Sequence, residues 1–259
     1  MTMVALEDLY RPYRPKRRTR ATIAKEKGLE PLAEILRAQA TTRTIEEEAT
    51  AFVDAEKGVE SVQDAIDGAK DILAEVYADD ADYRTKLRAM TKESGSLVAK
   101  AKDEEADSVY EMYYDFSEPI KKLVGHRILA INRGEAEKFL TVKIEAPRQE
   151  ILLWLVKQII GNMKHDSASY LYEAITDSYD RLIAPSIERE IRNELTEKAE
   201  EGAIGVFGKN LHQLLMQPPI SGQVVLGWDP GFAHGSKLAV VDETGKVLDT
   251  VIILSLIHI

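Results

Sequence analysis

Apolar and small side chains recur at intervals of three and four residues between positions 46 and 77. They fall at Phe52, Ala55, Val59, Val62, Ile66, Ala69, Leu73 and Val76. This spacing lines one face of an α-helix and predicts a long helical segment. Gly58 and Gly68 lie inside it and weigh against one unbroken helix. Similar signals predict helices at residues 32–37, 83–91, 167–183 and 185–215, and a helical segment that opens at 118–119.

Strand signals are fewer, and most lie near the end of the sequence. Residues 139–145 alternate between apolar and polar positions, which predicts one short strand among the helices. Three apolar runs follow at 224–228, 237–241 and 247–254, with a turn signal at 242–245. The pattern therefore predicts a mainly α fold. We expect a multi-helix scaffold with one short β segment, and then three strands of a second domain that begins near residue 222.

Asp229 directly follows the first of these three strands and opens the sequence Asp-Pro-Gly. A carboxylate after a first strand, with two more strands behind it, is how a ribonuclease-H-like α/β domain begins. In such folds the carboxylate helps to hold divalent cations that activate water. One carboxylate does not make a two-metal site, and Asp-Pro-Gly is also a common turn. We therefore expect an incomplete ribonuclease-H-like domain, in which Asp229 is a catalytic or metal-binding candidate only if other ligands join it.

Other catalytic chemistry finds no support in the sequence. There is no cysteine, which fits a reducing cytosol, and the five histidines lack the spacing of metal ligands on one helix face. Phosphate-binding loops and serine nucleophile elbows are absent as well. We expect no enzymatic activity, no cofactor and no bound metal. Because we find neither a signal peptide nor an apolar run of about 20 residues, we also expect a cytoplasmic protein without a membrane-spanning segment.

Charge is divided unevenly along the chain, whose net charge is −10. Residues 11–27 hold eight basic side chains and one acidic one, whereas residues 28–120 hold 23 acidic and 10 basic side chains. Pro12 and Pro15 disfavour helix, so we expect residues 6–20 to form an extended connector. The sequence thus predicts a short basic arm on an acidic body, and a polyanion would approach at the arm.

Two interpretations of this basic arm stay open. Arginine forks match phosphate oxygens and tyrosine rings stack on bases, and Tyr10 and Tyr13 alternate with the first arginines. This interpretation predicts RNA or DNA as a partner, bound by Arg11, Arg14, Lys16, Arg17, Arg18 and Arg20. In the second interpretation the arm is a connector that packs against the acidic helices of the same chain.

Four stretches together resemble one protein family. They are residues 9–36 (LYRPYRPKRRTRATIAKEKGLEPLAEIL), 116–135 (FSEPIKKLVGHRILAINRGE), 184–204 (APSIEREIRNELTEKAEEGAI) and 206–250, which contains VVLGWDPGFAHGSKLAVVDETGKV. The chain resembles the bacterial Tex proteins from about residue 5 to 253. The resemblance implies a cytoplasmic, nucleic-acid-binding transcription accessory factor without an established enzymatic activity. Members of the family combine a helical region with a YqgF-type ribonuclease-H-like domain, a helix-hairpin-helix region and an RNA-binding OB-fold.

By this resemblance the chain divides into four parts. Residues 1–21 are the basic connector, 22–221 the Tex-type helical region, and 222–254 the start of the YqgF-type domain, in which Asp229 matches the first carboxylate position. Residues 255–259 end a tail, LSLIHI, that departs from the family, and we expect them to be foreign sequence. The loop after Asp229 reads FAHGSK and also departs from the family pattern, which puts an inherited role for this loop in doubt.

Three functions fit the sequence. The first is a non-catalytic fragment of a Tex-type factor that contacts nucleic acid through the arm. The second is a metal-dependent ribonuclease-H-like nuclease or resolvase fragment, which Asp229 suggests. The third is a helical scaffold that docks proteins of the transcription or translation machinery through its acidic, amphipathic helices.

Overall fold

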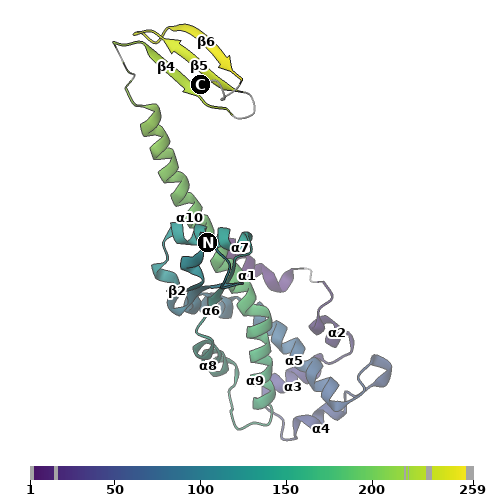
Figure 1. Ribbon diagram of the computed structural model, residues 1–259. Helices are drawn as coiled ribbons and strands as arrows, with labels where there is room; N and C mark the ends of the chain where they lie inside the picture. The colour runs from purple at the N-terminus through teal and green to yellow at the C-terminus, as the bar shows by residue number, and fades with distance from the viewer. Residues whose placement is uncertain (1–2, 15–16, 219, 221, 232–234, 255–259) are drawn as a thin grey trace. The chain divides into compact units, whose positions relative to one another are not determined.

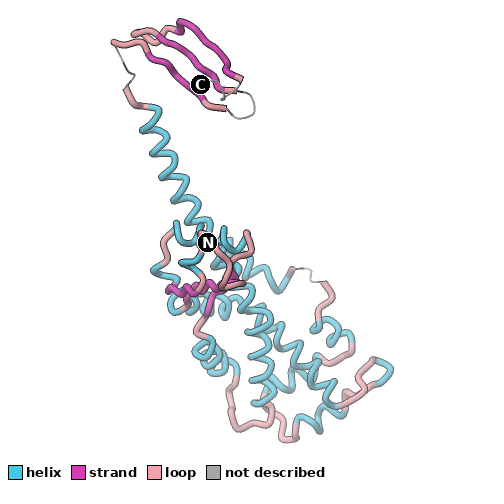
Figure 2. Tube along the Cα trace, viewed as in Figure 1, coloured by secondary structure: helices cyan, strands magenta, loops and turns pink. Residues whose placement is uncertain are grey.

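The computed structural model describes residues 3–14, 17–218, 220, 222–231 and 235–254. Two compact units can be distinguished, Met1–Ala203 and Ile204–Ile259, and each is described by itself. The first unit is mainly helical, and the second contains a three-stranded sheet (Figures 1 and 2). No helix in the described part of the chain is long and apolar enough to cross a membrane.

Helices make up most of the first unit (Figure 2). The α-helices are α1 (Met3–Tyr10), α2 (Arg20–Glu26), α3 (Glu30–Ala38), α4 (Ile45–Thr50), α5 (Val62–Asp79), α6 (Ala81–Ser94), α7 (Gly125–Ala136), α8 (Arg148–Ile159), α9 (Ala168–Asp177) and α10 (Ala184–Leu215). Short 3-10 turns lie at η1 (Arg11–Tyr13), η2 (Ala55–Lys57), η3 (Glu111–Tyr113) and η4 (Ile120–Lys122).

The long helix predicted over residues 46–77 is in fact two helices with a loop between them. The loop turns at Gly58, whose φ of 73° is readily adopted only by glycine, and Ser61 then caps α5 by accepting a hydrogen bond from the Asp64 amide. Val59 belongs to this loop and is nevertheless fully buried. The three-and-four spacing continued through the loop because Val59 also faces the core, so the pattern overstated the helix.

Helix α5 lies at the centre of the main hydrophobic core and contacts α2, α3, α4 and α9. Gly68 stands where the turn before α3 crosses it. A Cβ added at Gly68 would lie 2.3 Å from Cδ1 of Leu29, a fully buried side chain. In the sequence Gly68 weighed against a continuous helix, but in the structure it lies within α5 and lets Leu29 pack closely against that helix.

A small antiparallel sheet in the first unit has the strand order β2-β1-β3, with β1 at Ser96–Ala101, β2 at Asp115–Pro119 and β3 at Leu140–Glu145. The prediction of a strand at 139–145 is confirmed, but β1 and β2 were missed. Residues 118–119 end β2, so the helical segment expected to open there begins only at Ile120, as the short 3-10 turn η4, and helix α7 follows from Gly125. Three consecutive residues of β1 are buried, so the strand lacks the alternation that reveals a half-exposed one.

The outer edge of β3 is covered by side chains from α10. Glu188 Oε1 accepts a hydrogen bond from the Ile144 amide at 2.9 Å, and Arg192 Nη1 donates to the Val142 carbonyl at 3.5 Å. An edge strand otherwise offers unpaired backbone groups to other chains. These contacts fix β3 against α10, and residues 144–148 lie beside the segment that leads into α10.

Helices α9 and α10 are joined without a break by a π-helix, η5 (Ser178–Ile183). The sequence predicted two helices that meet at Pro185. Proline has no amide hydrogen and its ring clashes with the carbonyl four residues earlier, which normally ends or kinks a helix. A wider π-turn immediately before Pro185 accommodates this defect and lets one helix continue into the next.

The apolar face predicted along α10 is buried only over part of its length. Ile187, Ile191 and Ala199 are buried in the first unit, whereas Val206 and Phe207, in the second, are 62% and 67% exposed. The apolar periodicity predicts which face of a helix is apolar. It does not predict how far along the helix other elements cover that face.

The second unit contains the three strands that the sequence predicted. They are β4 (Val225–Asp229), β5 (Ser236–Val241) and β6 (Val247–Ile253), paired antiparallel in the order β4-β5-β6. Asp242 closes the turn between β5 and β6, where its Oδ1 accepts hydrogen bonds from the Thr244 and Lys246 amides. Leu226, Trp228 and Val251 are each at least half exposed, so both the fold and the apolar surface expected here are present.

Limited proteolysis is expected to cut first between residues 216 and 222. Met216 and Ile220 are 70% and 61% exposed, and proteases need an accessible backbone that can adapt to their active site. Brief digestion followed by intact-mass analysis should give a large product that retains the helical unit. Equal survival of both units, or first cleavage within α5 or α9, would contradict this expectation.

Candidate functional site

The basic arm begins at an ion-pair cluster that fastens α1 to α6 and α10. Asp8 on α1 accepts hydrogen bonds from Arg84 Nε at 2.6 Å and from Arg88 Nη2 at 2.7 Å. Glu190 on α10 accepts from the same two arginines, at 2.6 Å from Arg84 Nη2 and 2.7 Å from Arg88 Nη2. The Arg84 side chain is fully buried, and Asp8 is 3% exposed. We call Asp8, Arg84, Arg88, Ser186 and Glu190 the ionic cluster.

Arg11 joins this cluster and does not point freely into solvent. Its Nη2 donates to Ser186 Oγ at 3.2 Å, and partial burial together with the nearby Arg84 lowers the pKa of Arg11. The structure also corrects the first part of the expected extended connector, because residues 3–10 form α1 and residues 11–13 form the turn η1. At Arg11 the arm packs as a connector, and we leave this residue out of the interface proposed below.

The remaining arginines of the arm are exposed. Arg14, Arg17 and Arg20 point to solvent, and Arg18 forms an exposed ion pair with Glu26 at 2.9 Å. Lys16 lies outside the described residues. Tyr10 and Tyr13 are 55% and 80% exposed, so their rings are accessible for stacking. The predicted binding residues therefore fall into two groups: Arg11 is packed against the fold, whereas the other described arginines of the arm are accessible.

Both ends of the arm are held by the fold. The ionic cluster holds α1 before it, and Thr19 starts α2 behind it by accepting a hydrogen bond from the Thr22 amide at 3.1 Å. Ala21 and Ala24 then bury one face of α2 in the main core. Thus Arg14, Arg17 and Arg18 lie between two fixed points and Arg20 is the first residue of α2. This arrangement lowers the conformational entropy that a ligand would have to remove.

Asp229 ends β4 and lies opposite Lys237 in the sheet register. It is exposed and borders a depression of about 700 Å³ on the sheet, together with Trp228 and Leu238. Among the described residues, no group of three or more histidine, aspartate or glutamate side chains could hold a metal ion. Part of the loop that follows, residues 232–234, lies outside the described residues. In the part of the chain that the structure describes, Asp229 therefore has no companion ligands for a metal ion.

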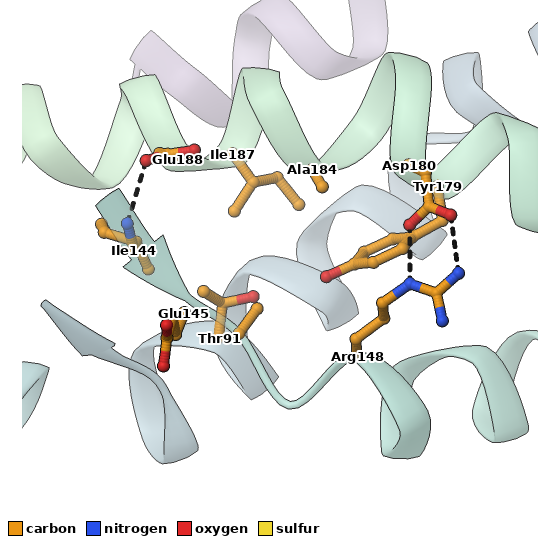
Figure 3. A pocket seen from close by; sticks show the side chains of 10 residues that line it. Thr91, Ile144, Glu145, Arg148, Tyr179, Asp180, Ala184, Ile187 and Glu188 are labelled. Atoms are coloured by element: carbon orange, nitrogen blue, oxygen red, sulfur yellow. Dashed lines mark hydrogen bonds and ion pairs between the residues drawn. The ribbon is translucent and has the colours of Figure 1, made fainter. Parts of the chain in front are cut away.

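A second concave site lies where the π-helix passes the end of β3, and the sequence analysis missed it. This π-helix cleft has a volume of about 330 Å³ and is lined by Thr91, Ile144, Glu145, Arg148, Tyr179 and Glu188, among others (Figure 3). Arg148 makes a two-pronged ion pair with Asp180, at 2.9 and 2.7 Å. No sequence signal could have united these residues, because they come from three segments up to 97 positions apart in the chain.

Comparison with known proteins gives matches over most of the chain. Residues 40–207 match a family model described as Tex central region-like, and residues 223–257 match one described as Tex protein YqgF-like domain. The second match reaches into the tail 255–259, which lies outside the described residues; the prediction that this tail is foreign is untested.

Three relatives illustrate the similarity. The uncharacterized protein YdcI of Bacillus subtilis is 50% identical over 246 residues, which cover 94% of this chain and 34% of the relative. Protein tex of Bordetella pertussis is 37% identical, over 96% of this chain and 33% of the relative. The human S1 RNA-binding domain-containing protein 1 is 33% identical, over 96% of this chain and 26% of the relative.

The chain thus spans about a third of the length of YdcI and of protein tex, and about a quarter of the length of the human relative. The order of the two matched regions, helical first and YqgF-like second, is the order in which the two structural units occur. Because the central-region match alone covers more than half of the sequence, the chain belongs to the Tex family.

Proposed function

We propose that this chain is the non-catalytic part of a cytoplasmic, Tex-type transcription accessory factor, and that it contacts RNA or DNA through the basic arm. A relative from Neisseria gonorrhoeae is named transcriptional accessory protein Tex, and the human relative is named for an RNA-binding domain. The proposal includes no cofactor, no metal and no membrane contact. The predicted division into a connector (1–21), a helical region (22–221) and a YqgF-like start (222–254) belongs to the same proposal.

The observation that carries the proposal is the exposure of Arg14, Arg17 and Arg20 within seven residues of an otherwise acidic chain. Each guanidinium group keeps its charge and offers a planar fork to phosphate oxygens. Binding would release counterions from the nucleic acid, so the affinity should fall steeply with salt. Arg18 can add a fourth contact once it leaves Glu26, because an exposed ion pair contributes little.

The test compares the natural chain with a variant in which Arg14, Arg17 and Arg20 are alanine. Fluorescent single-stranded RNA and duplex DNA are titrated at about 50 and 200 mM salt, with anisotropy as the readout. If three phosphate contacts are lost, the slope of log affinity against log salt should fall by about 2 for RNA and slightly more for duplex DNA. The fold should persist, because none of the three side chains is buried.

A matched control changes Arg43, Lys157 and Lys164 to alanine. These three cations are also exposed and their removal alters the net charge equally, but they lie elsewhere on the helical unit. The control should bind like the natural chain. Equal weakening by both variants would mean that only net charge matters, and unchanged binding by the arm variant would exclude the arm as the contact.

Two alternative functions predict other results in the same samples. A nuclease that uses Asp229 would shorten the nucleic acid in the presence of Mg²⁺, and Asp229→Asn would abolish the cleavage. A docking scaffold is favoured by the exposed apolar side chains of α10 from Ile204 onward. It would retain proteins of the transcription or translation machinery from cell extract even after nuclease treatment.

A further inference from the structure

The π-helix cleft contains the hydroxyl group of a tyrosine whose ring is buried. Tyr179 is 3% exposed, and Figure 3 shows its hydroxyl group pointing into the middle of the cleft, on the side of Thr91. Within the described part of the chain this hydroxyl has no hydrogen-bond partner. Burial raises the pKa of Tyr179 to about 12, so the group stays protonated and neutral at physiological pH. The ring is buried, but the oxygen atom is open to the cleft, so water or a ligand there supplies its hydrogen-bond partner.

The charges around this hydroxyl group are mostly negative. Glu188 is anchored at the rim because one of its carboxylate oxygens accepts from the Ile144 amide, and Glu145 follows on the same strand end. Asp180 is neutralised by its two-pronged contact with Arg148, which is the only basic residue among the described residues that line the cleft. The cleft therefore has a net negative charge, carried by Glu145 and Glu188.

The walls between these groups are apolar. Ile144 and Ala146 come from the end of β3 and the residue after it, and Ala184 and Ile187 come from the first turn of α10. An anion would be repelled by these two carboxylates, whose charges no cation of the cleft neutralises, and a small hydrated metal ion would gain nothing from aliphatic walls. A long cationic side chain has the required form, because its methylene stem packs on apolar surface while its charged end reaches polar groups.

We propose that the π-helix cleft binds an ammonium or guanidinium group carried on an aliphatic stem. Glu145 and Glu188 neutralise the charge, the Tyr179 oxygen accepts one N–H hydrogen bond, and Ile144 and Ile187 cover the stem. Two sources supply this chemistry, a lysine or arginine side chain of a partner protein and a free alkyl amine. The inference does not depend on nucleic-acid binding by the arm, and it uses none of the arm's residues.

Titration of the full chain followed by backbone-amide NMR tests this site. The probes are agmatine, which carries a guanidinium group on a four-carbon stem, and butylamine, with uncharged N-butylacetamide as their neutral counterpart. At about 0.15 M salt, where exposed charges are screened, both cations should shift amides at 144–148 and 179–188 in a saturable manner. Ligands of so few atoms should have dissociation constants of about 1 to 10 mM.

Three variants separate this site from general attraction to an acidic surface. Tyr179→Phe removes only the hydroxyl oxygen and Glu145→Gln removes only one charge, and each should weaken binding about two- to tenfold. Glu150→Gln is the matched control, because Glu150 is exposed in the first turn of α8 and does not line the cleft. This control should bind as the natural chain does.

The same titration with blocked tripeptides that carry a central lysine or arginine separates the two sources. Tighter binding of the tripeptides than of the free amines identifies a protein side chain as the natural ligand. Tighter binding of the free amines identifies a small amine. Equal binding of N-butylacetamide, shifts spread over the acidic surface without saturation, or equal affinity in all three variants would each overturn the proposal.

Discussion

Replacing Glu190 with alanine is expected to lower the free energy of unfolding of the helical unit by about 3 kcal/mol. Glu190 accepts hydrogen bonds from Arg84, Arg88 and Ser186, and Arg84 is fully buried. The variant would leave two arginines facing the single carboxylate of Asp8. Removing one partner from a buried charge network costs far more than the network contributes, because the remaining charge stays out of water without compensation. Urea unfolding of the full chain, followed by helical circular dichroism, measures the change.

The control for this prediction is Glu194→Ala, one turn further along α10. Glu194 also pairs with a cation, Lys92 on α6, but its side chain is 59% exposed. Water and salt screen such a pair, so its removal should cost less than about 1 kcal/mol. Equal losses in the two variants would show that the ionic cluster is accessible to water and would sink the prediction.

Asp8→Ala gives a different expected result, although Asp8 is the most central carboxylate of the ionic cluster. Met3, Leu6 and Leu9 on α1 are all at least half exposed, so little apolar burial holds this helix in place. The variant can release α1 and let water reach the two arginines, which limits the loss. We therefore expect Asp8→Ala to destabilise the helical unit less than Glu190→Ala does.

The sequence revealed those elements whose signal is local. The three strands of the second unit each form a short apolar run, and the helices at 83–91 and 167–183 each repeat apolar residues on one face. The pattern failed where distant residues decide the structure. Strand β1 pairs with β2 and β3 from up to 49 positions away, and its three consecutive buried residues do not alternate. The prediction of one helix through Val59 failed for the opposite reason: a buried loop residue fell at a position that fits the helical spacing.

The candidate sites show the same division. A run of arginines is visible in the sequence, so the arm was found, but the sequence could not separate Arg11 from Arg14. That difference depends on Ser186, which lies 175 positions away. The π-helix cleft had no sequence signal at all. It forms because the helix widens into a π-turn before Pro185, which has no amide hydrogen, and because Glu188 fixes the end of β3 opposite that turn.

Gly95→Ala is expected to destabilise the helical unit by about 2 to 3 kcal/mol through crowding. Gly95 joins α6 to β1, and its amide donates to the Thr91 carbonyl at 2.8 Å. A Cβ at this position would lie 2.4 Å from that carbonyl oxygen and 3.1 Å from the carbonyl oxygen of Glu145. Both atoms belong to the backbone, so no side-chain rotation relieves the contact. The last turn of α6, which carries the Thr91 carbonyl, must distort, and the end of β3 at Glu145 must shift slightly.

The same substitution at Gly202 supplies the matched control for this last prediction. Gly202 lies within α10, and an added Cβ there meets no atom within 4 Å. Alanine is the better helix former, so Gly202→Ala should stabilise the helix by up to about 1 kcal/mol. Opposite signs for two chemically identical changes can come only from their surroundings. If urea unfolding instead gives Gly95→Ala a stability equal to that of the natural chain, then the last turn of α6 and the end of β3 do not enclose Gly95 as tightly as the structure shows.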